Sequence, residues 1–162
     1  MIDWPRLLAD SAVLIGIATA YLLVVAMRNP RLFLQDFPPA VRAAVPPRTR
    51  AETREAAIIG LPFMLALLGY PFVAVHRLGA VSFTGRFVHA LGISMAFNTW
   101  DLLVLDWLVV CAITPRLFVI PGTEGNPGYK DYAFHFRGFL IGTGLSIAWS
   151  LVVALAATFV RA

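Results

Sequence analysis

The chain has 162 residues, of which 59% are hydrophobic and only 14% are charged, and its mean hydropathy is +0.78. A water-soluble domain of this length could not bury so much apolar surface, so the composition excludes an ordinary cytosolic enzyme and indicates one domain surrounded by lipid. The net charge of +4 comes from arginines that lie between apolar runs, which favours membrane topology over nucleic-acid binding. Because Cys111 is the single cysteine, no disulfide, metal centre or cofactor is expected.

Four apolar runs are each long enough to cross a membrane, since a spanning helix needs about 20 such residues. The runs cover, approximately, residues 7–27, 56–75, 87–113 and 138–160. They predict an all-α integral membrane four-helix bundle, with a single transmembrane domain over residues 1–162. Thr49 to Glu52 fits a capping box, so it predicts an ordered start for the second helix.

The basic residues set the expected orientation. The loops 28–55 and 114–137 contain nine of the 13 Lys and Arg residues, and the other four lie on the opposite side. Positive residues concentrate in the cytoplasm, so both loops are predicted to be cytoplasmic and both termini to lie outside, in a plasma membrane.

The proline-rich loop 28–55 contains several large apolar side chains. We expect it to be an interfacial segment that places Leu32, Phe33, Leu34 and Phe37 in the headgroup zone. A lid or docking surface over a cytoplasmic site is the alternative.

Small residues recur at every fourth position along the predicted fourth helix, at Gly138, Gly142, Ser146 and Ser150. Helices approach closely in lipid where such residues lie, because lipid provides no hydrophobic drive for association. The pattern favours packing within the chain, and a homodimer through this face is the alternative.

The third run carries Asn98, Asp101 and Asp106. On an α-helical wheel Asp101 lies about 60° to one side of Asn98 and Asp106 about 80° to the other, so the three border one polar face. An acid inside a membrane persists only where it is paired, hydrated or protonated. Asp101 and Asp106 are therefore candidate catalytic residues, as an acid/base pair or a proton relay. The alternative is that each carboxylate has a partner within the bundle, such as Tyr21 or Tyr70.

Polar and aromatic residues between the third and fourth runs form a second candidate site. Together with Asn98, the candidate ligand-binding residues are Glu124, Tyr129, Lys130, Asp131, His135 and Arg137. The basic members of this group suit an anionic headgroup or a phosphate, or simply an interfacial belt. On the opposite side, His76 and His89 are expected to be solvated or to face headgroups, and no metal site is predicted.

Two segments of the sequence are similar to segments of known proteins. They are NPRLFLQDFPPAVRAAVPP at 29–47 and DLLVLDWLVVCAITPRLFVIPGTEGNPGYKDYAFHFRGFLIGTG at 101–144. Together they resemble small four-pass bacterial membrane proteins. The resemblance implies a four-helix plasma-membrane protein and carries over no activity.

These observations predict a membrane protein with a polar, cytoplasm-facing site for a lipid-like or small anionic ligand, built on the third helix and the loop into the fourth. Membrane lipid is the expected partner. One alternative is a proton-coupled transporter or channel subunit that acts as an oligomer. Another is a non-catalytic accessory subunit, and no motif decides whether the protein is an enzyme.

Overall fold

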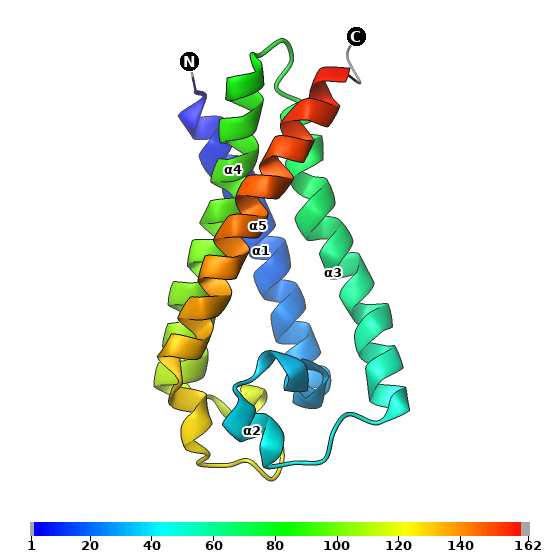
Figure 1. Cartoon of the computed structure of the whole chain (residues 1–162), viewed down its shortest axis with the longest axis vertical. Coiled ribbons are helices and arrows are strands. Elements are labelled where there is room, and N and C mark those ends of the chain that lie inside the picture. Colours follow the sequence, from blue (N-terminus) through cyan, green and yellow to red (C-terminus); the bar gives the residue numbers. More distant parts are fainter. Residues whose placement is uncertain (1, 160–162) are drawn as a thin grey trace.

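A computed structural model describes residues 2–159 and shows four long apolar helices (Figure 1). This confirms the predicted all-α four-helix bundle, and no strand occurs in the described part of the chain. In chain order the elements are α1 (Trp4–Arg28), η1 (Pro30–Asp36), α2 (Pro39–Ala43), α3 (Arg50–His76), α4 (Phe83–Trp100), η2 (Asp101–Ile113), η3 (Arg116–Phe118), η4 (Pro127–Lys130) and α5 (Tyr132–Phe159).

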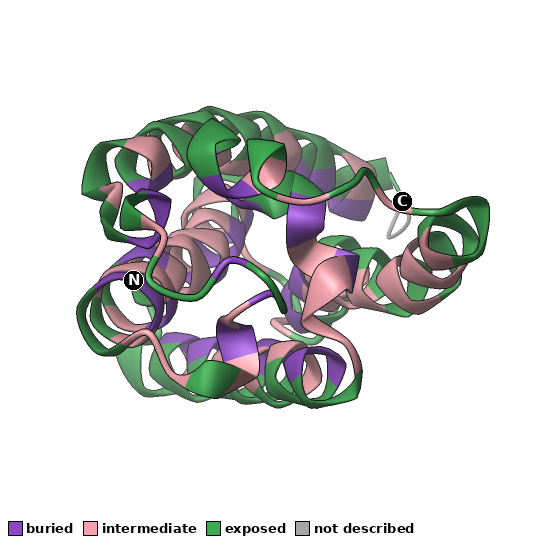
Figure 2. Cartoon of the chain, turned by 90° about the horizontal axis from the view of Figure 1, so that it is seen from below, coloured by how far each residue is buried: buried purple, intermediate pink, exposed green. Residues whose placement is uncertain are grey.

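The four spans are α1, α3, the continuous helix formed by α4 and η2, and α5. Both ends of the chain lie at one end of the bundle, and the two longest connections meet at the other (Figure 1). Seen from below, exposed residues cover the outer faces of the helices and buried residues lie toward the inside (Figure 2). The exposed residues include many large apolar ones, as a lipid environment requires.

Local capping fixes where two of the helices begin. The predicted capping box is confirmed at α3: the Glu52 N–H donates to Thr49 Oγ1 at 3.1 Å, and the Thr49 N–H donates to the Glu52 carboxylate at 2.7 Å. The fourth helix begins at Tyr132 rather than at residue 138. The reason is Asp131, whose carboxylate accepts the Phe134 N–H at 2.9 Å and satisfies the first turn.

The helix α3 contains Pro62 and Pro71, each of which disturbs the hydrogen-bond ladder. The carbonyl three residues before Pro62 accepts a hydrogen bond from the Tyr21 hydroxyl of α1. The carbonyl three residues before Pro71 accepts one from the Trp149 indole of α5 at 3.0 Å. Neighbouring helices thus provide partners where the prolines weaken α3 internally.

The second half of the third span, η2, is a π-helix of 13 residues. In a π-helix the N–H of each residue bonds to the carbonyl five residues earlier, so residues five apart lie closer together around the axis than the roughly 140° of an α-helix. Asp101 and Asp106 are five apart and therefore share a face more closely than the α-helical wheel predicts. The helix ends at Thr114, which has the left-handed φ of 51° and donates its N–H to the Val109 carbonyl at 2.8 Å.

A small hydrophobic core closes the end of the bundle opposite the termini. We call this region the cap; it comprises residues 30–45 and 115–130. Its core joins Leu34 and Phe37 to Tyr129 and to Val110 of η2. Leu32, Leu34 and Phe37 therefore pack inside the cap instead of contacting headgroups, because each is at most 4% exposed, and their depth in the membrane stays a prediction.

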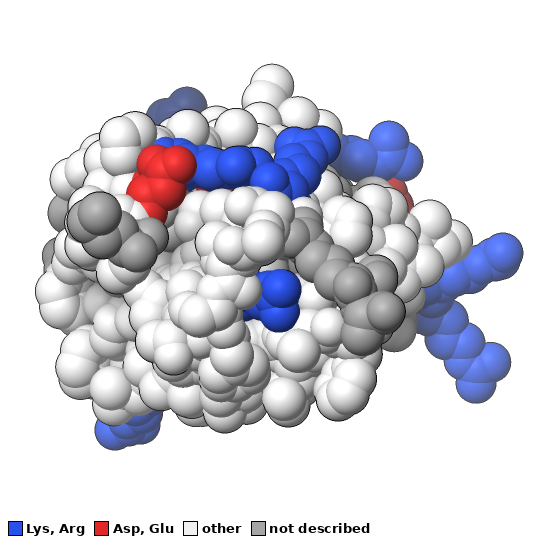
Figure 3. Space-filling model, turned by 90° about the horizontal axis from the view of Figure 1, so that it is seen from above, with Lys and Arg blue, Asp and Glu red and all other residues white. Residues whose placement is uncertain are grey.

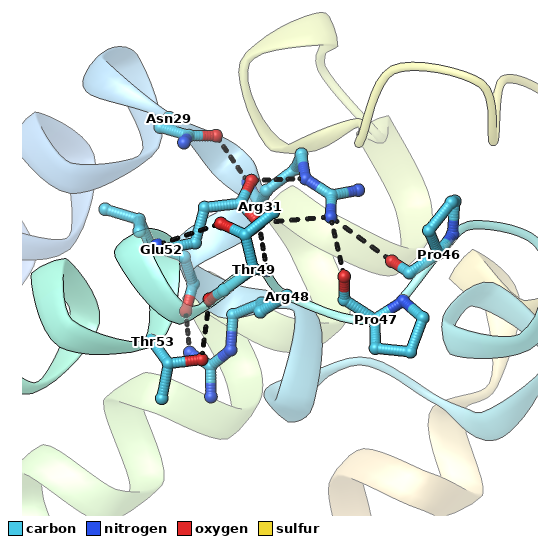
Figure 4. A network of polar contacts seen from close by, with 9 residues as sticks. Asn29, Arg31, Pro46, Pro47, Arg48, Thr49, Glu52 and Thr53 are labelled. Atoms are coloured by element: carbon cyan, nitrogen blue, oxygen red, sulfur yellow. Dashed lines mark hydrogen bonds and ion pairs between the residues drawn. The ribbon is translucent and has the colours of Figure 1, made fainter.

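An arginine cluster fastens the base of α3 to the cap (Figure 4). The Arg31 Nε donates to the Glu52 carboxylate at 2.6 Å, and its Nη2 lies 3.2 Å from the Pro46 carbonyl and 3.4 Å from that of Pro47. The carboxylate of Glu52 thus serves both the helix cap and the ion pair.

The pair Arg31–Glu52 is mostly shielded from solvent, with side chains 20% and 17% exposed, whereas Arg28–Glu55 is 66% and 33% exposed. Double-mutant cycles with Arg→Met and Glu→Gln are expected to give a coupling free energy of about 1–2 kcal/mol for the first pair and below about 0.5 kcal/mol for the second. Thermal unfolding in detergent measures both. Equal coupling in the two pairs would show that Arg31 does not fasten α3.

The helices α4 and α5 pack closely at Asn98. The Asn98 Nδ2 donates to the Phe139 carbonyl and to Thr143 Oγ1, both at 3.1 Å. Its Oδ1 occupies the space in which a Cβ on Gly142 would lie, at only 2.4 Å. The absence of a side chain at Gly142 thus permits the contact.

Replacing Gly142 tests this packing. Gly142→Ala forces Asn98 out of position and breaks its two hydrogen bonds, so we expect a loss of about 1–3 kcal/mol in unfolding free energy. Gly144→Ala is the matched control, because a Cβ there meets nothing within 4 Å. It is expected to change stability by less than about 0.5 kcal/mol. Similar effects of both substitutions would contradict the assignment.

The four small residues predicted on one face of α5 have different surroundings. Gly142 packs on Asn98, and Ser150 is 0% exposed, so neither is free to meet a second copy. Gly138 is exposed and Ser146 is half-buried. A homodimer through this face stays a prediction that rests on these last two residues.

Candidate functional site

A cavity of about 1300 Å³ lies inside the bundle between α1, α3, α5 and the third span. The cavity exists because α3 diverges from α5 toward the cap (Figure 1). One wall is apolar and is formed by residues of all these helices, including Leu22, Phe63, Met64, Leu67, Phe97 and Leu145. At the cap end, η1 and Arg48 border the space. The cavity therefore combines an apolar chamber with access to polar groups near the cap.

The polar wall comes mainly from η2 and the first turn of α5. Asn98, Asp101, Asp106 and His135 line it, and Asp36 of η1 faces them from the cap. The His135 Nδ1 lies 3.0 Å from Asp106 Oδ1. The sequence placed His135 in the loop before the helix, but the early start of α5 carries it into the bundle, where it is only 7% exposed.

Several acceptor atoms of this wall have no partner. Within residues 2–159, neither the Asp36 nor the Asp101 carboxylate takes part in a hydrogen bond or a salt bridge, and the buried Nε2 of His135 has no hydrogen-bond partner. The carboxylates of Asp36, Asp101 and Asp106 are close enough to interact electrostatically. The wall is therefore rich in acceptors that the protein itself leaves unsatisfied.

The environment of Asp36 affects its ionisation. Removal of water from around its carboxyl raises its pKa above the usual value, the Arg48 guanidinium opposes this shift, and the Asp106 carboxylate adds to it. The Arg48 Nη1 donates to the Leu32 carbonyl at 2.8 Å, while the buried Nε of Arg48 has no hydrogen-bond partner within residues 2–159.

Two further predicted residues border the cavity. Asp131 lines it while capping α5, and Arg137 lines it with its side chain exposed. The structure thus brings Asn98, Asp101, Asp106, Asp131, His135 and Arg137 to one cavity.

Three other predicted residues lie away from the cavity and have structural partners. Tyr129 is 2% exposed, and its hydroxyl accepts the Ile120 N–H at 2.8 Å within the cap. The Glu124 carboxylate accepts the Gly122 N–H at 3.0 Å. Lys130 Nζ donates to the carbonyls of Cys111 and Ala112 and to Thr114 Oγ1. Lys130 thereby satisfies carbonyls at the end of η2, where a cation also interacts favourably with the helix dipole.

This position predicts a structural role for Lys130. Lys130→Met should lower the unfolding free energy by about 1–3 kcal/mol, because it leaves the last carbonyls of η2 without a donor. The exposed Arg116 is the matched control, and Arg116→Met should have little effect. Thermal unfolding compares the two variants. Unchanged stability of Lys130→Met would leave anion binding as its remaining role.

A second polar cluster lies near the termini. The Asp10 carboxylate contacts His89 Nε2 at 2.9 Å and accepts the Tyr70 hydroxyl at 3.0 Å. Arg86 Nη1 donates to Thr158 Oγ1 at 2.8 Å. His76 is exposed as predicted, but the expectation of a solvated or headgroup-facing side chain is wrong for His89, which is 3% exposed. Its partner Asp10 was not recognised because it lies 79 residues away in sequence.

Sequence reasoning also missed Asp36 and Arg48 as parts of the site. Both lie in a loop interpreted as interfacial, and only the folding of the cap under the bundle brings them to the cavity. The sequence signal for Asp36 is that it is the one acid in the mostly apolar run from Leu32 to Phe37.

No three His, Cys, Asp or Glu side chains within residues 2–159 are arranged to hold a metal ion. Comparison of the chain with protein-family models, with curated proteins and with solved structures found no match.

Proposed function

We propose that this protein binds a lipid-like amphiphile in the cavity between α3 and α5. The observation that carries the proposal is the cavity itself: about 1300 Å³ of space inside a membrane bundle, apolar along the helices and polar near the cap. Ligand sites are typically concave and mostly apolar, with a few convergent polar groups. An amphiphile matches both parts of this lining.

The apolar part of the ligand would lie along α3. Phe63, Met64 and Leu67 line the cavity there, and Leu145 lines it from α5. Since α3 diverges from α5 toward the cap, a molecule dissolved in the bilayer would enter sideways between these helices. The cap core closes the direct route from the aqueous side.

The polar part of the ligand would lie at the acceptor wall. Buried or partly buried polar groups are normally hydrogen-bonded, and an unsatisfied group in a native structure calls for an explanation. A polar ligand group beside Asp101 and His135 would supply the missing partners. The Asp106–His135 pair would orient the ring, because a hydrogen bond at Nδ1 leaves Nε2 to face the ligand.

The same proposal places the protein in a bacterial plasma membrane, with the cap in the cytoplasm and both termini outside. Nine of the 13 basic residues lie within residues 28–55 and 114–137, near the cap end, which the positive-inside rule assigns to the cytoplasm. The view from the terminal end shows Lys and Arg on only part of a surface that is otherwise largely uncharged (Figure 3).

A glycine substitution tests the proposal without altering a polar residue. Gly60 lines the cavity, and a Cβ there meets nothing within 4 Å, so we expect Gly60→Leu to extend a side chain into the space. Gly69→Leu is the control on the same helix, because Gly69 also has open space but does not line the cavity. Mass spectrometry of molecules retained by each protein in lipid discs should show a defined amphiphile with the wild type and with Gly69→Leu, and at least about tenfold less with Gly60→Leu.

Identical retained molecules in all three proteins, dominated by bulk lipid, would contradict the proposal. That outcome would favour the accessory-subunit alternative and direct the search to protein partners.

A further inference from the structure

Carboxylates and the His135 ring form most of the polar wall of the cavity, with Arg48 and Arg137 at its edge. The carboxylates of Asp36 and Asp101 have no hydrogen bond or salt bridge within residues 2–159. The Nδ1 of His135 faces the Asp106 carboxylate at 3.0 Å, so this nitrogen carries a hydrogen, and in the neutral ring Nε2 presents a lone pair. That Nε2 is buried without a partner, in a side chain that is 93% removed from solvent.

The charges around the cavity are not balanced. Four aspartates line it, Asp36, Asp101, Asp106 and Asp131, against two arginines. Arg48 donates to a cap carbonyl and Arg137 is exposed, so neither forms a salt bridge with these acids within the described residues. A carboxylate at membrane depth requires a partner, water or a proton.

We infer that the polar end of the bound amphiphile is a protonated primary amine, held by the carboxylates of Asp36 and Asp101 and donating an N–H to Nε2 of His135. This inference rests on the proposed function and specifies the class of its ligand. An ammonium group supplies positive charge and three donors, which suit three acceptors without partners. An anionic head, which the sequence predicted, would instead meet four aspartates against two arginines.

The arrangement of the carboxylates and His135 favours an organic cation over a metal ion. No three acidic, His or Cys side chains within residues 2–159 are arranged as metal ligands. The adjoining apolar wall also requires a tail that a bare ion lacks.

Matched single-chain amphiphiles test the inference. The wild-type protein in phosphatidylcholine discs is titrated with dodecylamine, dodecyltrimethylammonium, dodecanol and dodecyl phosphate, and binding is measured by calorimetry. Dodecylamine should bind at least about tenfold more tightly than the other three, because only it combines the charge with N–H donors. A second series in discs containing phosphatidylethanolamine shows whether a lipid headgroup amine competes for the same site.

Substitutions then assign the binding to named residues. Asp101→Asn and Asp36→Asn should each weaken dodecylamine binding by about tenfold or more. Asp3→Asn is the control: it removes the same charge at the far end of the bundle, where Asn caps α1 as well as Asp does. Thermal unfolding checks that the variants fold, and Asp36 provides an independent test because it lies in the cap rather than in a span.

The outcomes separate the inference from the proposed function. If dodecyl phosphate or dodecanol binds as well as the amine, or both Asn variants bind the amine as the wild type does, the amine assignment is overturned. The proposed function stands in that case provided that Gly60→Leu abolishes the binding. If no amphiphile binds the wild type more tightly than Gly60→Leu, both fail.

Discussion

The Asn98 side chain joins the third span to α5, and the positions of the other polar groups depend on this junction. Its amide bonds to two oxygens of α5, and its carbonyl occupies the space that Gly142 leaves open. The third span and α5 run antiparallel. Residues that follow Asn98 toward the cap therefore lie beside residues that precede Phe139 in α5. Asp106 consequently meets His135. A half-buried amide that donates two hydrogen bonds to the neighbouring helix fixes this register more firmly than apolar contacts do in lipid.

The helix α3 is held differently, and the cavity results from that difference. Near the termini it contacts the bundle through Tyr70 and accepts the Trp149 indole hydrogen bond. At its base the Arg31–Glu52 pair ties it to the cap. Between these points Tyr21 provides a polar contact, and its ring stacks on Phe63 with centroids 4.8 Å apart. A helix fastened near its ends can diverge from its neighbours and leave space along its middle.

The sequence predicted the parts of this fold that depend on local pattern. Hydropathy located the four spans, and the Thr49–Glu52 motif identified the start of α3. The π-helical geometry of η2 was not predictable from periodicity, because the wheel assumes an α-helix. The pairing of Asp10 with His89 and the burial of the cap core depend on contacts between distant segments. The pattern of the third span predicted a role for its acids, and the structure adds Asp36 of the cap to the same cavity.

The cap has a consequence for how the protein is made. Its core combines Leu34, Phe37 and Val41 with Phe118, Ile120 and Tyr129, and two membrane spans separate these groups in sequence. Because a chain emerges from the ribosome with its N-terminal part first, residues 30–45 must wait for partners made after the third span. Until then their apolar side chains have only the membrane surface to cover them. The floor of the cavity is therefore completed late in biosynthesis, about when the last helix enters the bilayer.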